Sequence, residues 1–223
     1  MTRRDLPATV APMSPSLAGP PASFSPSSGP AFIVVDGTSE LLKTVAGAAE
    51  SVSVIGSKPS RVLEGNFGDD RALGLFRAAD LNAANTVLES LRASMNGFHD
   101  AGRLCVGHHA LGDDAPDPAD ERDLAYLVVH GFISNREVYG AYLRGLKESG
   151  LLTTNGCERL LMMGPSNVRT VAARPLVAGE YFEVLSFPSR ASIEAFWLSD
   201  AYAKLIDVRR GAVDVFAAIF GPG

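Results

Sequence analysis

The sequence has few of the features that mark secreted, membrane-spanning or nucleic-acid-binding proteins. Its 223 residues include only two cysteines, Cys105 and Cys157, which lie far apart and without metal-ligand spacing. We therefore expect two reduced thiols in a cytoplasmic protein. No apolar run approaches the ~20 residues that a membrane-spanning helix needs. No hydrophobic segment follows Arg3 and Arg4, as one would in a secretory signal.

Basic residues are also scarce. Lys and Arg total 20 against 25 Asp and Glu, which gives a net charge of −5, and no segment concentrates positive charge. This balance excludes the basic surface of a nucleic-acid-binding protein and the attraction of a polybasic segment to anionic lipids. We expect neither a nucleic acid nor a membrane among the partners. Hydrophobic residues make up 46% of the chain, which is typical of a globular protein with a sizeable core.

Two segments of low complexity divide the chain. Residues 1–30 are rich in Pro, Ser, Ala and Gly, and they predict a disordered N-terminal arm because they cannot bury enough apolar surface to fold. Residues 112–122, "GDDAPDPADER", combine Pro with five acidic side chains and predict a linker. Two halves of similar length remain, residues 31–111 and residues 123–223.

The two halves resemble each other. The first begins with "AFIVVDG" at Ala31 and the second with "AYLVVHG" at Ala125. Each continues with an amphipathic helix, a hairpin-like pair of apolar runs, a further strand, a second helix and a final strand. This order predicts two tandem β-α-β-β-α-β, ferredoxin-like units of the α+β class.

The second half resembles domain-of-unknown-function family 1330, whose members are dimeric α+β barrels. The resemblance rests on "REVYGAYLRGL" and on "EVLSFPSRASIEAFWLSDAYAKLIDVRR", and the matching residues are Tyr139, Tyr142, Phe187, Pro188, Ser189, Trp197, Ser199, Tyr202 and Arg209. The first half carries the family's Leu-Glu-Gly signature in "VLEGNFGDDR", with Glu64 and Arg71. The family has no general reaction assigned.

The resemblance implies that the sheets of the two halves face each other. A tandem duplication would thus form an intramolecular dimeric α+β barrel, a pseudo-dimer, and a further homodimer stays open. Strand alternation places Phe32, Val34 and Asp36 on one face, and Tyr126, Val128 and His130 on the equivalent face of the second half. If these faces line the barrel, Asp36 and His130 lie near its pseudo-twofold axis.

This juxtaposition makes His130 and Asp36 candidate catalytic residues, since a carboxylate can orient an imidazole that acts as base or acid. The alternative is that both lie at strand ends and contact solvent. Glu183 is a third catalytic candidate, because a carboxylate among apolar strand residues has a raised pKa when buried; the alternative is an exposed edge residue. Alternation puts Tyr181 on the same face as Glu183.

Further residues are candidates for substrate contact, namely Tyr126, Phe32, Tyr181, Glu64 and Arg71. For Glu64 and Arg71, a structural ion pair is the competing interpretation, and Arg209 is expected to bridge its helix to a neighbouring strand. His108 and His109 are adjacent on a strand and point to opposite faces, so we predict no metal site. No phosphate-binding loop or nucleophile motif is present, and we predict no cofactor.

The functional hypothesis is a small-molecule enzyme that performs acid/base chemistry in a cavity between the two sheets. The reaction would be a cyclisation, isomerisation or dehydration of an apolar small molecule, a chemistry found in secondary metabolism, with His130 as base or acid and Asp36 or Glu183 as its partner. The alternatives are a non-catalytic ligand-binding or assembly module and a cofactor-independent monooxygenase.

Overall fold

The computed structural model describes residues 30–48, 52–56, 58–92, 102–108, 124–165, 168–172 and 175–221. The predicted arm up to residue 29, the predicted linker and His109 lie outside the described residues. Within the described residues, no helix combines the length and the hydrophobicity needed to cross a bilayer.

The described residues of the first half form five strands and two helices. They are β1 (Ala31–Thr38), α1 (Ser39–Ala48), β2 (Val52–Ile55), β3 (Arg61–Glu64), β4 (Arg71–Ala78), α2 (Leu81–Arg92) and β5 (Gly102–His108). The second half repeats this order with β6 (Ala125–Ile133), α3 (Arg136–Ser149), α4 (Leu151–Thr154), β7 (Glu158–Met163), β8 (Val168–Ala172), β9 (Glu180–Phe187), α5 (Arg190–Trp197), α6 (Asp200–Arg210) and β10 (Val213–Phe220).

Local sequence signals explain the helix ends in the second half. The Asn135 side chain accepts hydrogen bonds from the first-turn N–H groups of α3, and Gly150 ends this helix with a positive φ of 64°. The stretch from 190 to 210 forms two helices, because Ser199 interrupts it and caps α6 by accepting from Tyr202 N. These caps fix where the helices lie over the second sheet.

The strands form two antiparallel sheets, with strand orders β2-β4-β1-β5-β8 and β3-β10-β6-β9-β7. The predicted hairpins are wrong. β2 pairs with β4 in the first sheet, whereas β3 pairs with β10 in the second. In the second half, β7 pairs with β9, whereas β8 crosses to β5 of the first sheet. Each half therefore gives one edge strand to the sheet of the other.

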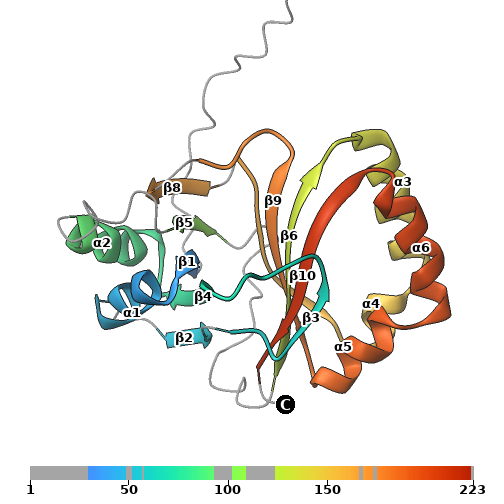
Figure 1. The fold of residues 1–223 in the computed structure, drawn as a ribbon, viewed down its shortest axis with the longest axis horizontal. Helices are drawn as coiled ribbons and strands as arrows, with labels where there is room; N and C mark the ends of the chain where they lie inside the picture. Colours follow the sequence, from blue (N-terminus) through green and yellow to red (C-terminus); the bar gives the residue numbers. More distant parts are fainter. Residues whose placement is uncertain are drawn as a thin grey trace, which may run out of the picture.

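Four layers follow from this arrangement (Figure 1). Helices α1 and α2 cover the outer face of the first sheet, and α3, α5 and α6 cover the outer face of the second. A core between the sheets includes Phe32 and Val34 from β1 and Tyr126 and Val128 from β6, the faces that strand alternation predicts. The chain is thus two ferredoxin-like units in an intramolecular α+β barrel.

Candidate functional site

A cluster of charged side chains lies where β1 and β6 face each other. Arg71 of β4 donates two hydrogen bonds to Asp36, from Nε to Oδ1 at 2.6 Å and from Nη2 to Oδ2 at 3.0 Å. His130 of β6 turns its Nδ1 toward Asp36, with 4.0 Å between Nδ1 and Oδ2. The structure thus brings Asp36 and His130 together across the two sheets.

The carboxylate that contacts His130 is Glu180, at the start of β9. Its Oε1 lies 2.9 Å from His130 Nε2 and 2.7 Å from Nη1 of Arg103 on β5, and its Oε2 accepts from Val177 N at 3.0 Å. Glu180 is only 3% exposed and Arg103 8%. The cluster therefore ties the first sheet to the second through a buried ion pair.

These contacts determine the protonation of the cluster. Burial by itself raises the pKa of Glu180, but hydrogen bonds from Val177, Arg103 and His130 outweigh it and lower the pKa to about 2. An ionised Glu180 only accepts, so His130 carries its proton on Nε2 and leaves Nδ1 as an acceptor. Burial lowers the pKa of His130, although its hydrogen bond to Glu180 and the charge of Asp36 act to raise it. His130 is thus a neutral base near pH 7.

Apolar side chains surround this cluster. The His130 ring stacks on Phe182 at 4.1 Å between centroids, and the Arg71 guanidinium lies 4.7 Å from the Phe216 ring. Phe32 and Tyr126, two predicted substrate contacts, are 0% and 4% exposed in the core between the sheets. At these positions a packed core fills the space in which we expected a cavity.

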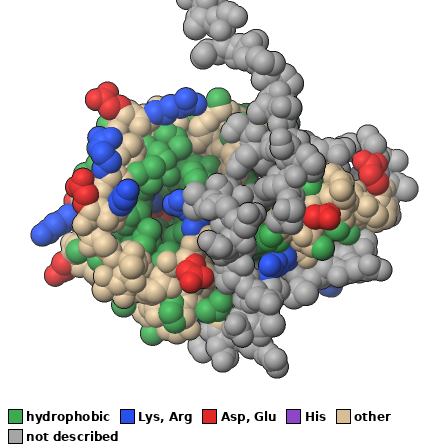
Figure 2. All heavy atoms as spheres, turned by 180° about the vertical axis from the view of Figure 1, so that it is seen from behind, with side chains coloured by type: hydrophobic (Ala, Val, Ile, Leu, Met, Phe, Trp, Pro, Cys, Tyr) green, Lys and Arg blue, Asp and Glu red, His purple; other side chains and the backbone are tan. Residues whose placement is uncertain are grey.

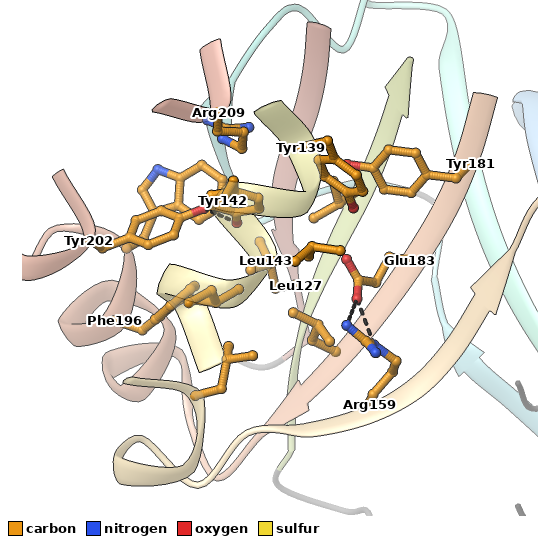
Figure 3. A pocket seen from close by; sticks show the side chains of 15 residues that line it. Leu127, Tyr139, Tyr142, Leu143, Arg159, Tyr181, Glu183, Phe196, Tyr202 and Arg209 are labelled. Atoms are coloured by element: carbon orange, nitrogen blue, oxygen red, sulfur yellow. Dashed lines mark hydrogen bonds and ion pairs between the residues drawn. The ribbon is translucent and has the colours of Figure 1, made fainter. Parts of the chain in front are cut away.

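Two adjoining cavities lie instead between the outer face of the second sheet and its helices. Figure 3 shows the side chains that line the inner one. The inner cavity has a volume of ≈ 30 Å³, and the outer depression, at α3 and α4, has ≈ 430 Å³. We call both together the sheet–helix pocket; Leu143, Leu146, Leu152, Arg159 and Leu185 line both parts. Seen from behind, hydrophobic side chains gather around a hollow on the half of the molecule that carries the second sheet (Figure 2).

Glu183 projects into this pocket and is not the partner of His130, contrary to the sequence prediction. Alternation along β9 turns Glu180 and Phe182 toward the first sheet but Glu183 toward the helices. Arg159 of β7 binds Glu183, with Nε and Nη2 at 2.7 and 2.6 Å from Oε1. Burial raises the pKa of Glu183, although the charge and hydrogen bond of Arg159 oppose this.

Tyrosines surround the inner cavity. Tyr181, a predicted substrate contact, lines it from β9 with Tyr139 and Tyr142 of α3 and Tyr202 of α6. The hydroxyls of Tyr142 and Tyr202 lie 3.2 Å apart. Burial raises the pKa of Tyr139 to about 12 and raises those of the other three as well. All four are hydrogen-bonding hydroxyls at neutral pH.

The predicted Glu64–Arg71 pair does not form. Arg71 binds Asp36, and Glu64 of β3 accepts from Nη2 of Arg209 on α6. The exchange of β3 between sheets explains the difference, because it carries Glu64 away from its own half and under α6 of the other. The expected bridge from Arg209 to a strand is confirmed.

Sequence reasoning missed Glu180, Arg103 and Arg159 as members of these sites. Alternation did place Glu180 on the face of Phe182, opposite Glu183, so the signal was present. The antiparallel register of β6 and β9, which pairs His130 with Phe182, was needed to bring Glu180 to the imidazole. Arg103 and Arg159 gave no comparable signal, because each is the second residue of its strand and arginine is mostly exposed in proteins.

Comparisons with known proteins add a likeness of fold. No protein-family model and no curated protein matches the sequence. A variant of DypB from Rhodococcus jostii RHA1, solved in complex with heme, is 10% identical with a TM-score of 0.47 and covers 89% of this chain and 94% of its own. An anthrone oxidase-like protein is 13% identical with a TM-score of 0.45 and coverages of 86% and 92%.

A third similar structure is an uncharacterized ferredoxin fold protein from Listeria monocytogenes, related to antibiotic biosynthesis monooxygenases. It is 8% identical with a TM-score of 0.37, and the match covers 86% of this chain and 95% of that one. No activity is carried over from these likenesses.

Proposed function

We propose that the protein is a small-molecule enzyme that performs acid/base chemistry in the sheet–helix pocket, with Glu183 as the proton-transferring group. The observation that carries this proposal is a carboxylate with a raised pKa inside an apolar, tyrosine-lined pocket. Such a group is a better proton acceptor than an ordinary glutamate.

The position of Arg159 beside the Glu183 carboxylate supports this role. Its Nε and Nη2 both contact Oε1 of the carboxylate, and we infer that Oε2 is the oxygen that meets a substrate proton. The side chain of Glu183 is 12% exposed, and Arg159 beside it lines both the inner cavity and the outer depression. We infer that Arg159 orients Glu183 and that Oε2 exchanges the proton.

The outer depression defines the class of substrate. Its volume of ≈ 430 Å³ falls in the range of about 300–1,000 Å³ that is usual for small-molecule sites. Leucines form much of its wall, which favours an apolar molecule. Removal of a proton from such a molecule leads to isomerisation, cyclisation or dehydration, and none of these needs an oxidant.

The catalytic prediction for His130 and Asp36 stays a second hypothesis. It is favoured by the unprotonated Nδ1 of a neutral His130, which faces Asp36 across the sheets. Membership of family 1330 also stays a proposal. A cytoplasmic setting is likewise proposed, and the free thiols of Cys105 and Cys157 support it.

A chromogenic carbon acid tests the role of Glu183. 5-Nitrobenzisoxazole loses its ring C–H proton to a base while its N–O bond breaks, and it yields a coloured nitrile phenolate. We expect turnover that the Glu183→Gln variant lowers at least about 100-fold, since general-base catalysis contributes about 10²–10⁴. The rate should rise with pH through an inflection above the ordinary glutamate pKa, because the base form is active and its pKa is raised.

Glu158→Gln is the matched control, because Glu158 is an exposed carboxylate on the neighbouring strand β7. It should keep the wild-type rate within about twofold. Equal turnover by wild type and Glu183→Gln would refute the proposed base. Saturable binding of the probe without turnover would favour the non-catalytic binding module.

A further inference from the structure

Arg209 combines burial with an incomplete set of partners. It lies near the end of α6 and is 2% exposed. One guanidinium nitrogen, Nη2, donates to Glu64, and the guanidinium carbon lies 5.4 Å from the centre of the Trp197 ring. Its Nε is buried and has no hydrogen-bond partner among the described residues.

A buried donor without a partner is unfavourable, and the penalty is larger for a charged group. Buried polar groups in native proteins are nearly always hydrogen-bonded, so an orphaned one points to a ligand or a water. Arg209 lines the inner cavity of the sheet–helix pocket. Figure 3 places it at the same end as Tyr142 and Tyr202 and away from Arg159. Arg209, whose Nε lacks a partner, thus belongs to a site already lined by hydroxyl groups.

The charges near Arg209 indicate which kind of group can accept a hydrogen bond from its Nε. The Glu64 carboxylate compensates the guanidinium charge, so a second carboxylate at Arg209 would add an unbalanced negative charge to a buried site. A neutral acceptor such as a carbonyl oxygen adds none. It accepts from Nε and gains a charge-assisted hydrogen bond.

The size of the inner cavity limits which part of the ligand can enter it. A volume of ≈ 30 Å³ equals roughly the space of one water molecule. It admits an oxygen atom but not an alkyl chain. The apolar body must then stay in the outer depression.

We propose that Arg209 Nε binds the carbonyl oxygen of the substrate, so that the pocket selects apolar ketones with the oxygen directed inward. This inference rests on the proposed function and names its substrate class. When Glu183 takes a proton from the carbon beside the carbonyl, the electron pair of the C–H bond moves to the oxygen as an enolate. Arg209 and the tyrosine hydroxyls stabilise that negative charge. In a β,γ-unsaturated ketone the enolate is conjugated with the C=C bond, so Glu183 returns the proton to the γ carbon, the C=C bond moves to the α,β position and the C=O bond re-forms.

Trp197 reports on this site directly. It is the single tryptophan of the chain, it lines the inner cavity and Arg209 lies over its ring. Its fluorescence can be titrated with 2-octanone and with 2-methyl-1-octene, in which a methylene group replaces the oxygen. We expect wild type to bind the ketone at least about tenfold more tightly, since a hydrogen bond to a charged group is worth about that much.

Two substitutions of Arg209 should remove this preference. Arg209→Gln removes the charge and Arg209→Lys keeps it without the Nε donor, so one folded variant of the two is enough. Arg210→Gln, which changes the exposed neighbour of Arg209 on the same helix, should keep the preference. The infrared C=O stretch of bound 2-octanone should lie at lower frequency in wild type than in Arg209→Lys.

The outcomes separate this inference from the proposed function. Equal binding of ketone and alkene by wild type overturns the Arg209 anchor but leaves the pocket in place, as does a preference that survives both Arg209 substitutions. Tighter binding of octanoate than of 2-octanone overturns the carbonyl assignment. Absence of any saturable response at Trp197 overturns the pocket and, with it, the anchor.

Discussion

Glu180 is the central residue of the cluster between the sheets. It receives hydrogen bonds from Arg103 of the first sheet and from His130 of the second. Both carboxylate oxygens are occupied, since Val177 N binds the other one. A buried ion pair adds little net stability as a whole, but loss of one member leaves the other charged and buried. Loss of Glu180 would thus leave Arg103 charged and buried.

We therefore predict that Glu180→Gln lowers the free energy of unfolding by about 3–5 kcal/mol. Urea denaturation at pH 7 measures the change. Glu194→Gln is the control, because Glu194 binds Arg61 and Arg190 on the surface, where water screens the charges. It should leave the unfolding curve close to that of wild type. Equal effects of the two substitutions would contradict the assignment of Glu180 as a buried tie.

The same pair predicts how acid destabilises the protein. The pKa of Glu180 is lowered to about 2 in the folded state from an ordinary value of 4.5. The unfolded chain thus binds the proton first, and the stability that ionised Glu180 contributes is lost as pH falls from about 4.5 to about 2. Glu180→Gln should lack this part of the pH dependence, whereas Glu194→Gln should keep it.

From the sequence we could predict which residues share a face of a strand, but not which side chains they contact. Alternation placed Asp36 and His130 on equivalent faces of their strands, and it put Glu180 and Glu183 on opposite faces of β9. It did not show which carboxylate reaches the imidazole, because that depends on the register of two strands 50 residues apart. Asp36 and His130 are near each other as expected, while their catalytic role stays a prediction.

Among the elements, β3 and β8 were the least predictable. Both are short, with four and five residues, and the Gly/Pro/Ser sequence before each is of a kind that predicts a hairpin. Hydrogen bonds to either sheet edge satisfy such a strand equally well, so local sequence does not choose between them. The longer strands and helices were predicted correctly in order because their hydrophobic periodicity extends over several turns or alternations.

The pairing of β6 with β9 leads to a prediction about pocket shape. Tyr181 lies across from Gly131, and a Cβ at Gly131 would meet the Tyr181 ring at 2.5 Å. We expect Gly131→Ala to displace Tyr181 and to destabilise the protein by about 1–3 kcal/mol, as overpacking of a core does. Thermal unfolding measures the loss.

Gly140→Ala is the matched substitution in α3. The nearest atom to its added Cβ is a flexible Arg144 nitrogen at 3.6 Å, and alanine is favoured over glycine in a helix. We expect a gain of up to about 1 kcal/mol. A Gly131→Ala variant as stable as Gly140→Ala would mean that Tyr181 is not held over β6.

At the scale of the whole molecule, the two units share a ferredoxin-like architecture, interlock through exchanged strands and differ in their helices. The first sheet packs on α1 and α2 through a core that includes Leu41, Val45 and Leu88. The second sheet carries the longer α3 and the additional α4 and α6, and the sheet–helix pocket lies beneath them. These differences allow the second unit to form the sheet–helix pocket while the first unit packs against its sheet.

Interlocking predicts that the two units unfold together. The exchanged strands β3 and β8, the core between the sheets and the Arg103–Glu180 and Arg209–Glu64 pairs all connect them. Neither sheet can lose its structure without exposing the apolar face of the other, so unfolding should be a single cooperative transition.

Two probes, one in each unit, test this. Trp197 fluorescence reports on the second unit, and the thiol reactivity of Cys105, which is buried on β5 between the sheets, reports on the first. A Cys157→Ser background removes the partly exposed thiol of the second unit. In urea the two probes should give coincident midpoints, and far-ultraviolet circular dichroism should agree with both. Separate midpoints would show that the strand exchange does not couple the units, because each sheet would then keep its structure after the other is lost.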